Sequence, residues 1–421
     1  MSVIALLRKP NEEYAYFLQL PRPTRVLLAT NMIYAFVLPV IEIFVGAYIM
    51  RSSNNPAIVA IYQLTVYTGI PITFLLNGFL LNKVKISHLY SFGMLLSGLS
   101  MIVMMSLQNL SAAGVGIAGL LMGCSFGFFW ANRDFLALNT TTDASRNYYY
   151  GLETFFYTIT YIIVPVIVGA FLATTETGEW FQGNVNTAYR IVTVIVFLLT
   201  ILSSIVIHRE KFKNPVQKEF LFFKFHLLWK KMMVLAGLKG LAQGYLVTAP
   251  AILIMRLVGN EGSLGFVQGI SGVATAFMLY ILGRTTKPAD RIYIFAVGLL
   301  IFLAGTLFNG ILFSALGVIL FVLCKVLFAP LHDIAYFPTE MLVIDVVSRI
   351  EKRSEFAYIF NHEFGLYIGR FTGLLLFIVL ATYVSEGFAL KYALVIIAVI
   401  QLASIPMANH IIKEANRLKS L

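Results

Sequence analysis

Apolar segments long enough to cross a lipid bilayer recur along the whole 421-residue chain. A membrane-spanning helix needs about 20 mostly apolar residues, and open strands cannot satisfy their backbone groups inside lipid. Only 12% of the residues are charged and 59% are hydrophobic, unlike a soluble domain. The sequence predicts an all-α membrane protein with twelve transmembrane helices, at approximately 26–50, 57–81, 86–107, 110–138, 148–173, 187–208, 232–258, 263–283, 291–309, 311–338, 355–383 and 388–411.

The lysines and arginines of the predicted loops indicate how these helices are oriented. If the N-terminus lies in the cytoplasm, the inside segments carry 23 of these residues and the outside loops carry three. Basic residues concentrate in cytoplasmic loops, so both the N- and C-termini are predicted to be cytoplasmic. The bias also accounts for the net charge of +11, and no nucleic-acid partner is expected. We expect a multi-pass protein in the lipid bilayer of the plasma membrane, the bacterial inner membrane.

The longest inside loop separates two sets of six helices. It mixes Phe, Leu and Trp with Lys, a composition typical of an amphipathic helix that lies in the membrane interface. A lipid-binding or regulatory switch is the alternative to a simple linker. The predicted units are a cytoplasmic N-terminal segment at 1–25, a six-helix bundle at 26–208, a linker with an interfacial amphipathic helix at 209–231, a second six-helix bundle at 232–411 and a cytoplasmic tail at 412–421.

Similar strings in the two halves indicate an internal repeat. "GAYIMR" ends at Arg51 and "AILIMR" at Arg256, about half the chain later. "FFWANRD" ends at Asp134 and "LFAPLHD" at Asp333, again about half the chain later. Two pseudo-symmetric bundles of related origin explain both pairs.

This layout resembles the major facilitator superfamily over essentially the whole chain. "GFLLNKVKIS" is similar to that family's loop between helices 2 and 3, with Lys83 in place and Asn82 where aspartate is usual. "PVIVG", with Pro165 and Gly169, is similar to its antiporter motif, and "RNYYYGLE" is similar to the YqgE-type bacterial branch. The resemblance implies two bundles that rock around a site near the bilayer midplane and expose it to each side in turn.

Ionisable side chains inside the predicted helices are the first functional candidates, because charge in lipid is costly. A carboxyl at such a depth changes its proton affinity when its access to water changes. The proton-coupling candidates are Glu42 and Glu153, followed by Asp134 and Glu363. The alternative for Glu42 is a structural carboxyl that hydrogen-bonds to a tyrosine or to the backbone.

Cations within the helices could bind an anionic substrate. Arg256 lies at the outer end of its helix, like Arg51, and is expected to anchor the interface. Lys325 ranks below Arg370, which lies among glycines spaced for close helix packing at 365, 369 and 373. The cations inside the predicted helices are Arg133, Lys239, Arg256, Lys325 and Arg370.

Aromatic, amide and cationic side chains predict a cavity for a small amphipathic organic molecule. Simple aromatic packing is the alternative for its aromatic members. The substrate-cavity candidates are Asn31, Tyr34, Trp130, Lys239, Gln243, Tyr245, Gln268 and Arg370.

Charges at the inner helix ends predict a cytoplasmic gate, in which Arg133 or Arg146 pairs with Asp134 or Glu153. The gate candidates are Lys83, Arg133, Asp134, Arg146, Glu153, Asp333 and Glu363.

Two histidine–acid pairs suggest a divalent metal site as an alternative. Adjacent residues of a helix point about 100° apart, which argues against chelation by both members of a pair. The metal candidates are His332, Asp333, His362 and Glu363, whereas Glu340 and Asp345 are expected in a solvated loop. With only two cysteines in the sequence, neither a disulfide framework nor a cysteine-based metal site is predicted.

The sequence therefore predicts a secondary transporter that couples the export of a small organic or amphipathic molecule to protons, as a monomer without a cofactor. Movement of a divalent metal or an organic anion is the alternative within transport. A lipid scramblase or membrane sensor with the same fold and no coupled transport is the alternative of another class. The sequence contains no GxxxxGK[ST] nucleotide-binding loop and no recognisable catalytic constellation, so neither an ATP-driven pump nor an enzyme is predicted.

Overall fold

Helices make up every regular element of the residues described by the computed structural model, which are 17–141, 143–178, 181–214, 221–285, 288–353 and 355–420. The elements are α2 (Arg22–Tyr34), η2 (Val40–Phe44), α3 (Val45–Ser53), α4 (Pro56–Leu80), α5 (Ile86–Ser106), α6 (Ala112–Thr140), α7 (Asp143–Glu176), η3 (Phe181–Gly183), α8 (Val185–Ile207), α9 (Leu227–Leu246), α10 (Ala249–Leu257), α11 (Glu261–Thr285), η4 (Pro288–Asp290), α12 (Arg291–Leu312), α13 (Ala315–Glu351), α14 (Glu355–Val379), η5 (Leu380–Val384), α15 (Glu386–Gln401) and α16 (Ser404–Lys419).

Eleven helical spans of the described residues are long and apolar enough to cross a membrane. The chain is therefore a multi-pass membrane protein. The segment predicted at 26–50 is absent from the eleven because it is broken into α2, the π-helix η2 and α3. Pro39, next to η2, lacks the amide that would continue the helical hydrogen bonds. The count of twelve and the cytoplasmic termini stay predictions.

The second half begins with a similar interruption. Helices α9 and α10 are separated at Val247 and Thr248, and Pro250 lies in the first turn of α10. Discontinuous helices that expose backbone groups near the midplane are a common feature of transporter binding sites. Each half therefore begins with a helix that is interrupted well away from its ends.

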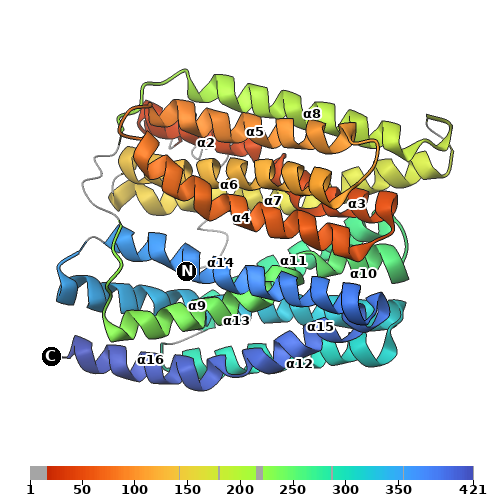
Figure 1. Ribbon diagram of the computed structural model, residues 1–421. Helices are drawn as coiled ribbons and strands as arrows, with labels where there is room; N and C mark the ends of the chain where they lie inside the picture. The colour runs from red at the N-terminus through yellow and green to blue at the C-terminus, as the bar shows by residue number, and fades with distance from the viewer. Residues whose placement is uncertain are drawn as a thin grey trace, which may run out of the picture.

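The helices form two groups that lie side by side (Figure 1). We call α2 to α8 the first half and α9 to α16 the second half. Helices of the first half fill the upper part of Figure 1, and those of the second half fill the lower part. The most extensive contacts between the halves come from α4 with α14, α7 with α11 and α3 with α10.

Glycines let several helices approach closely, as the spacing at 365, 369 and 373 predicted. A Cβ on Gly369 would lie 1.9 Å from the carbonyl oxygen of Gly237, where α14 crosses α9. Between the halves, a Cβ on Gly265 of α11 would lie 2.1 Å from the carbonyl oxygen of Pro165 on α7. The "PVIVG" motif thus forms a helix-packing contact between the halves.

The described parts of the linker, 209–214 and 221–226, are not helical, so the predicted interfacial helix is not formed there. Asn214 instead donates to the carbonyl groups of Leu81 and Val84 at 2.7 and 2.8 Å and accepts from the amide of Ile86 at 2.8 Å. These bonds hold the linker extended against the turn between α4 and α5. Residues 215–220 lie outside the described part of the chain.

Two other boundaries differ from the prediction. Helix α13 continues to Glu351, so Glu340 and Asp345 are helical, and Glu340 is buried rather than solvated. The predicted tail at 412–421 is largely helical, since α16 extends to Lys419. Hydropathy predicts only the part of a helix that contacts lipid. These helices continue beyond it because their next turns pack against protein or contain polar residues that favour a helix.

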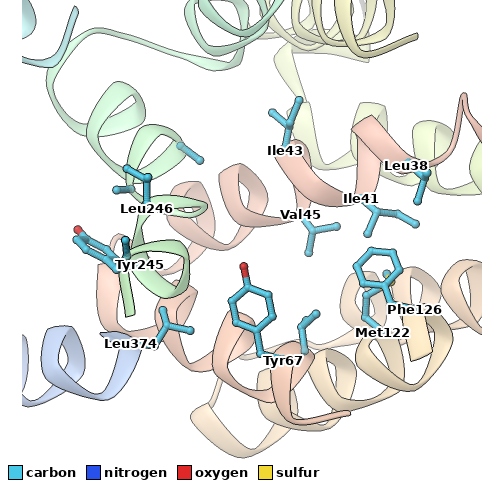
Figure 2. Packing of buried hydrophobic residues seen from close by; sticks show 14 of the residues in the cluster. Leu38, Ile41, Ile43, Val45, Tyr67, Met122, Phe126, Tyr245, Leu246 and Leu374 are labelled. Atoms are coloured by element: carbon cyan, nitrogen blue, oxygen red, sulfur yellow. The ribbon is translucent and has the colours of Figure 1, made fainter. Parts of the chain in front are cut away.

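Apolar packing extends right up to the interruption of the first helix. Figure 2 shows Ile41 and Val45 facing the side of Tyr67, Met122 and Phe126, all from the first half. Ile43, between them in sequence, points to the opposite side (Figure 2). The segment around η2 therefore presents two different faces to its surroundings.

Replacing Gly369 with alanine should destabilise the second half by about 1–3 kcal/mol, because the added methyl collides with rigid backbone. Gly151→Ala is the matched control, since a Cβ there meets nothing within 4 Å and alanine favours a helix. Thermal unfolding in detergent would measure both. A Gly369→Ala protein that melts at the parent temperature would contradict the close packing of α9 and α14.

Candidate functional site

A cavity of about 420 Å³ lies between the two halves, and we call it the Glu42 cavity. Residues of η2, α4, α6 and α14 line it, together with Val247 at the interruption between α9 and α10. Its walls are mostly apolar and aromatic. Four charged side chains reach it, which are Glu42, Asp134, Glu363 and Arg370.

Glu42 is positioned by η2 and is open to this cavity. Its carboxylate accepts a hydrogen bond of 2.6 Å from the hydroxyl of Tyr161 on α7. Glu42 therefore bonds to a tyrosine, as the structural alternative expected, and also faces the cavity. Among the described residues it has no ion-pair partner.

Glu153 lies in a buried polar cluster of the first half rather than in the cavity. Its carboxylate accepts from the guanidinium of Arg133 and, at 2.5 Å, from the amide of Asn31. Tyr149 donates to the same carboxylate at 3.2 Å. Arg133 also pairs with Asp134 at 2.6 Å. The prediction paired Arg133 or Arg146 with one of these two acids; Arg133 pairs with both, and both pairs lie inside one half.

A second buried cluster lies in the other half. Lys239 donates to Asp333 at 2.9 Å, and His332 contacts the same carboxylate at 3.2 Å. His362 contacts Glu340 at 3.1 Å through Nδ1 and the hydroxyl of Tyr336 at 2.7 Å through Nε2. Sequence reasoning placed Glu340 in a loop and missed this pair.

One sequence signal could have identified Glu340. It follows Asp333 by seven residues, which places both acids on the same face of a helix. The helix predicted at 311–338 ends before Glu340, whereas α13 continues to Glu351.

Arg370 lines the Glu42 cavity and also contacts the first half. It donates to the amide oxygen of Gln243 at 3.1 and 3.2 Å and pairs with Glu363 at 3.4 Å. Its guanidinium lies 5.0 Å from the ring centroid of Tyr67 on α4, within range of a cation–π contact. Trp130 also lines the cavity.

Several predicted residues lie elsewhere. Tyr34 and Tyr245 are fully buried, with Tyr34 donating to Ser97 at 3.1 Å and Tyr245 stacked on Phe377. These two are packing residues, which was the alternative considered for the aromatic candidates.

The predicted gate and metal residues are only partly brought together. Lys83 is exposed on the turn after α4, and the side chain of Arg146 lies outside the described part. His332 and His362 have different acidic partners. Within the described residues, no group of three His, Cys, Asp or Glu side chains could hold a metal ion.

A second cavity, of about 340 Å³, lies between α7, α11 and α13, and we call it the Lys325 cavity. Ile43 of η2 lines it, whereas Ile41 and Glu42 line the first cavity. The two cavities therefore flank η2. Gln268, a predicted substrate residue, lies here with Lys325.

One end of the molecule joins the two halves through charged groups, and we call it the Arg51 end. Arg51 of the first half binds Glu261 of the second half through two bonds of 2.5 Å. Tyr189 donates to the same buried carboxylate at 3.0 Å. Arg51 also pairs with Glu176 at 3.1 Å, so it is part of an ion-pair network and is not a simple interface anchor.

Arg256 adds another connection at this end, which lies on the right in Figure 1. Its guanidinium donates to Asn54 of the first half at 2.5 Å and pairs with Glu386 of its own half at 3.1 Å. Toward the opposite end, no ion pair of the described residues joins the two halves. Arg133 with Glu153 and Lys239 with Asp333 each lie within one half, and Arg22 pairs with Glu210 of the linker.

Comparisons with known proteins agree with the membrane-transporter architecture. No family model matches the chain. The chain is 22% identical over 380 residues to the uncharacterized protein YqgE of Bacillus subtilis (strain 168), a match that covers 89% of this chain and 86% of YqgE.

Two solved structures have the same fold. The POT family transporter PepTSo matches with a TM-score of 0.72 at 10% identity, over 95% of this chain and 99% of that one. A bacterial homologue of the iron transporter ferroportin, in an inward-facing state, matches with a TM-score of 0.65 at 15% identity, over 94% and 98%. The chain thus has the fold of these two transporters, which is the fold that the resemblance in its sequence implies.

Removing the cation from the first buried cluster should be far more costly than removing its exposed acid. Arg133→Met leaves Glu153 buried without its charged partner, at an expected cost of about 3–5 kcal/mol. Asp134→Asn should cost under about 1 kcal/mol, because 60% of the Asp134 side chain is exposed. Chemical unfolding in detergent would rank the two. Equal effects would show that Glu153 does not depend on Arg133.

Glu261→Gln should loosen the Arg51 end, because it removes the charge that Arg51 binds across the halves. Spin labels at Thr177→Cys and Gly387→Cys, in a protein whose native cysteines are replaced by serine, would report the distance between the halves. We expect a longer or broader distance distribution. The matched control is Glu386→Gln, whose partner Arg256 lies in the same half. Identical distributions for both variants would contradict this latch.

Proposed function

We propose that the chain is a secondary transporter that works by alternating access and couples the export of a small organic or amphipathic molecule to protons. The observation that carries the proposal is the Glu42 cavity, which is formed by both halves beside an interrupted helix. Rocking of the halves would expose such a cavity to each side of the membrane in turn. The transporter fold of the chain supports the same mechanism.

The uneven distribution of ion pairs supports a state that is closed on one side. Arg51 and Arg256 link the halves at one end, and α3 packs against α10 there. With the orientation predicted from loop charges, this end faces outward and the cytoplasmic side is the one that can open. A cavity that loads from the cytoplasm is what an exporter requires.

Glu42 is the best candidate for the proton carrier. Asp134, Glu153 and Glu363 each pair with an arginine, so each of these carboxylates already has a cationic partner. Glu42 has the hydroxyl of Tyr161 instead. A carboxyl without a fixed cation can gain and lose a proton as its access to water changes. We assign Glu153 the role of positioning Arg133 beside the cavity.

The other functions have weaker support. Divalent metals prefer several carboxylate or imidazole ligands together, and the described residues hold no such group. A lipid scramblase or sensor would not need a carboxyl such as Glu42 inside a cavity. We place the protein in the plasma membrane of a bacterium, which the similarity to a Bacillus subtilis protein supports.

Transport by the purified protein in liposomes, driven by an imposed pH gradient, tests the proposal. The panel would hold amphipathic organic molecules, organic anions and divalent metals. Glu42→Gln should lower gradient-driven flux of the transported class at least about tenfold and keep substrate exchange without a gradient, because exchange needs no net proton movement. Glu386→Gln, at the Arg51 end, is the control and should behave like the parent.

Three outcomes would overturn parts of the proposal. Unchanged gradient-driven flux in Glu42→Gln would remove the proton assignment. Movement of labelled lipid without any solute flux would favour a scramblase. Metal flux that is lost in His362→Ala would favour a metal transporter.

A further inference from the structure

The Lys325 cavity contains a cation, and none of the described residues that line the cavity is an acid. Lys325 lies on α13, ten residues after the helix begins at Ala315, and therefore about 15 Å along its axis. Its side chain is half-buried and lines the cavity. Within the described part of the chain, no Asp or Glu forms an ion pair with it.

This makes Lys325 different from the other cations inside the helices. Arg133 pairs with Glu153, Lys239 with Asp333, and Arg370 with Glu363. A charge at membrane depth is costly unless it has a partner or faces water. The described residues provide no acidic partner that would offset the free-energy cost of placing the Lys325 charge at this depth. This is expected for a cation whose partner is a ligand.

The side chains around Lys325 are suited to an oxyanion. Gln268, Ser271 and Thr275 line the cavity from one face of α11, at a spacing of three to four residues that stacks them along that face. Thr158 of α7 lines it from the opposite wall. Hydroxyl and amide groups donate hydrogen bonds to carboxylate oxygens. None of the described residues lining this cavity is acidic.

The remaining wall is apolar. Val322 and Val326 of α13 flank Lys325, and Ala276 and Leu279 continue the face of α11. A small organic body could lie against these side chains while its charged group reaches the lysine. The cavity volume of about 340 Å³ is in the range of small-molecule sites.

We propose that the Lys325 cavity is the binding subsite for the carboxylate of the transported molecule, which makes the substrate class a small organic acid with an apolar body. This inference rests on the proposed function. Tyr161 connects the subsite to the proton carrier, because it lines the Lys325 cavity and donates to Glu42 in the neighbouring cavity. Substrate and proton sites therefore share one side chain.

Ligand-induced thermal stabilisation of the full chain in detergent tests the subsite without needing transport. The probes are benzoate, phenylacetate and hexanoate, each compared with its uncharged amide. We expect at least one carboxylate, and not its amide, to raise the melting temperature of the parent. Lys325→Met should weaken the apparent Kd of that carboxylate about tenfold or more, as loss of a charged hydrogen-bond donor does, and Lys325→Arg should retain most of the affinity.

Lys391→Met is the matched control, because Lys391 lies near Phe313, its ammonium 4.9 Å from that ring, away from both cavities. If Lys325→Met does not fold, Lys325→Gln replaces it in the same measurement. A parent that none of the carboxylates stabilises, or a Lys325→Met variant that binds as tightly as the parent, would overturn the inference. Carboxylate binding through Lys325 without gradient-driven flux in liposomes would instead refute the proposed transport function and leave the subsite in place.

Discussion

The low polarity of the bilayer core is the constraint on which the rest of this structure depends. Charges and backbone groups in that region need partners inside the protein. Arg133 with Glu153 and Lys239 with Asp333 meet this requirement with short pairs inside each half. Glu42 and Lys325 lack an ionic partner in the described residues, and each lines a cavity. These two charged residues, without an ionic partner in the described part of the chain, therefore line the two candidate binding cavities.

Helix interruptions decide where those cavities lie. Pro39 precedes the π-helix that carries Glu42, and Pro250 follows the gap at Val247, which lines the Glu42 cavity. A straight helix would present one continuous face to its neighbours. Glu42 and Ile43 are neighbours on η2, and adjacent residues of a helix point in different directions, so the two side chains line different cavities. The two candidate sites are thus adjacent, with η2 between them.

The contacts between the halves are of two kinds. Glycines bring α7 and α11 together along their backbones. The bond from Arg51 to the buried Glu261 is directional and lies at one end. Alternating access, as proposed, would have to break the directional bond at this end while the halves stay in contact elsewhere.

The sequence by itself determined the helical class, most helix positions and the set of charges within the helices, because hydropathy and charge are properties of single residues. It did not determine which charges meet. Glu340 pairs with His362 only because α13 continues past its apolar stretch, and Glu153 is buried whereas Asp134 is exposed. Tyr34 and Tyr245 pack in the core, and Lys325, ranked low from sequence, lies in a cavity. These outcomes depend on helix rotation and on distances between helices, which only the tertiary structure sets.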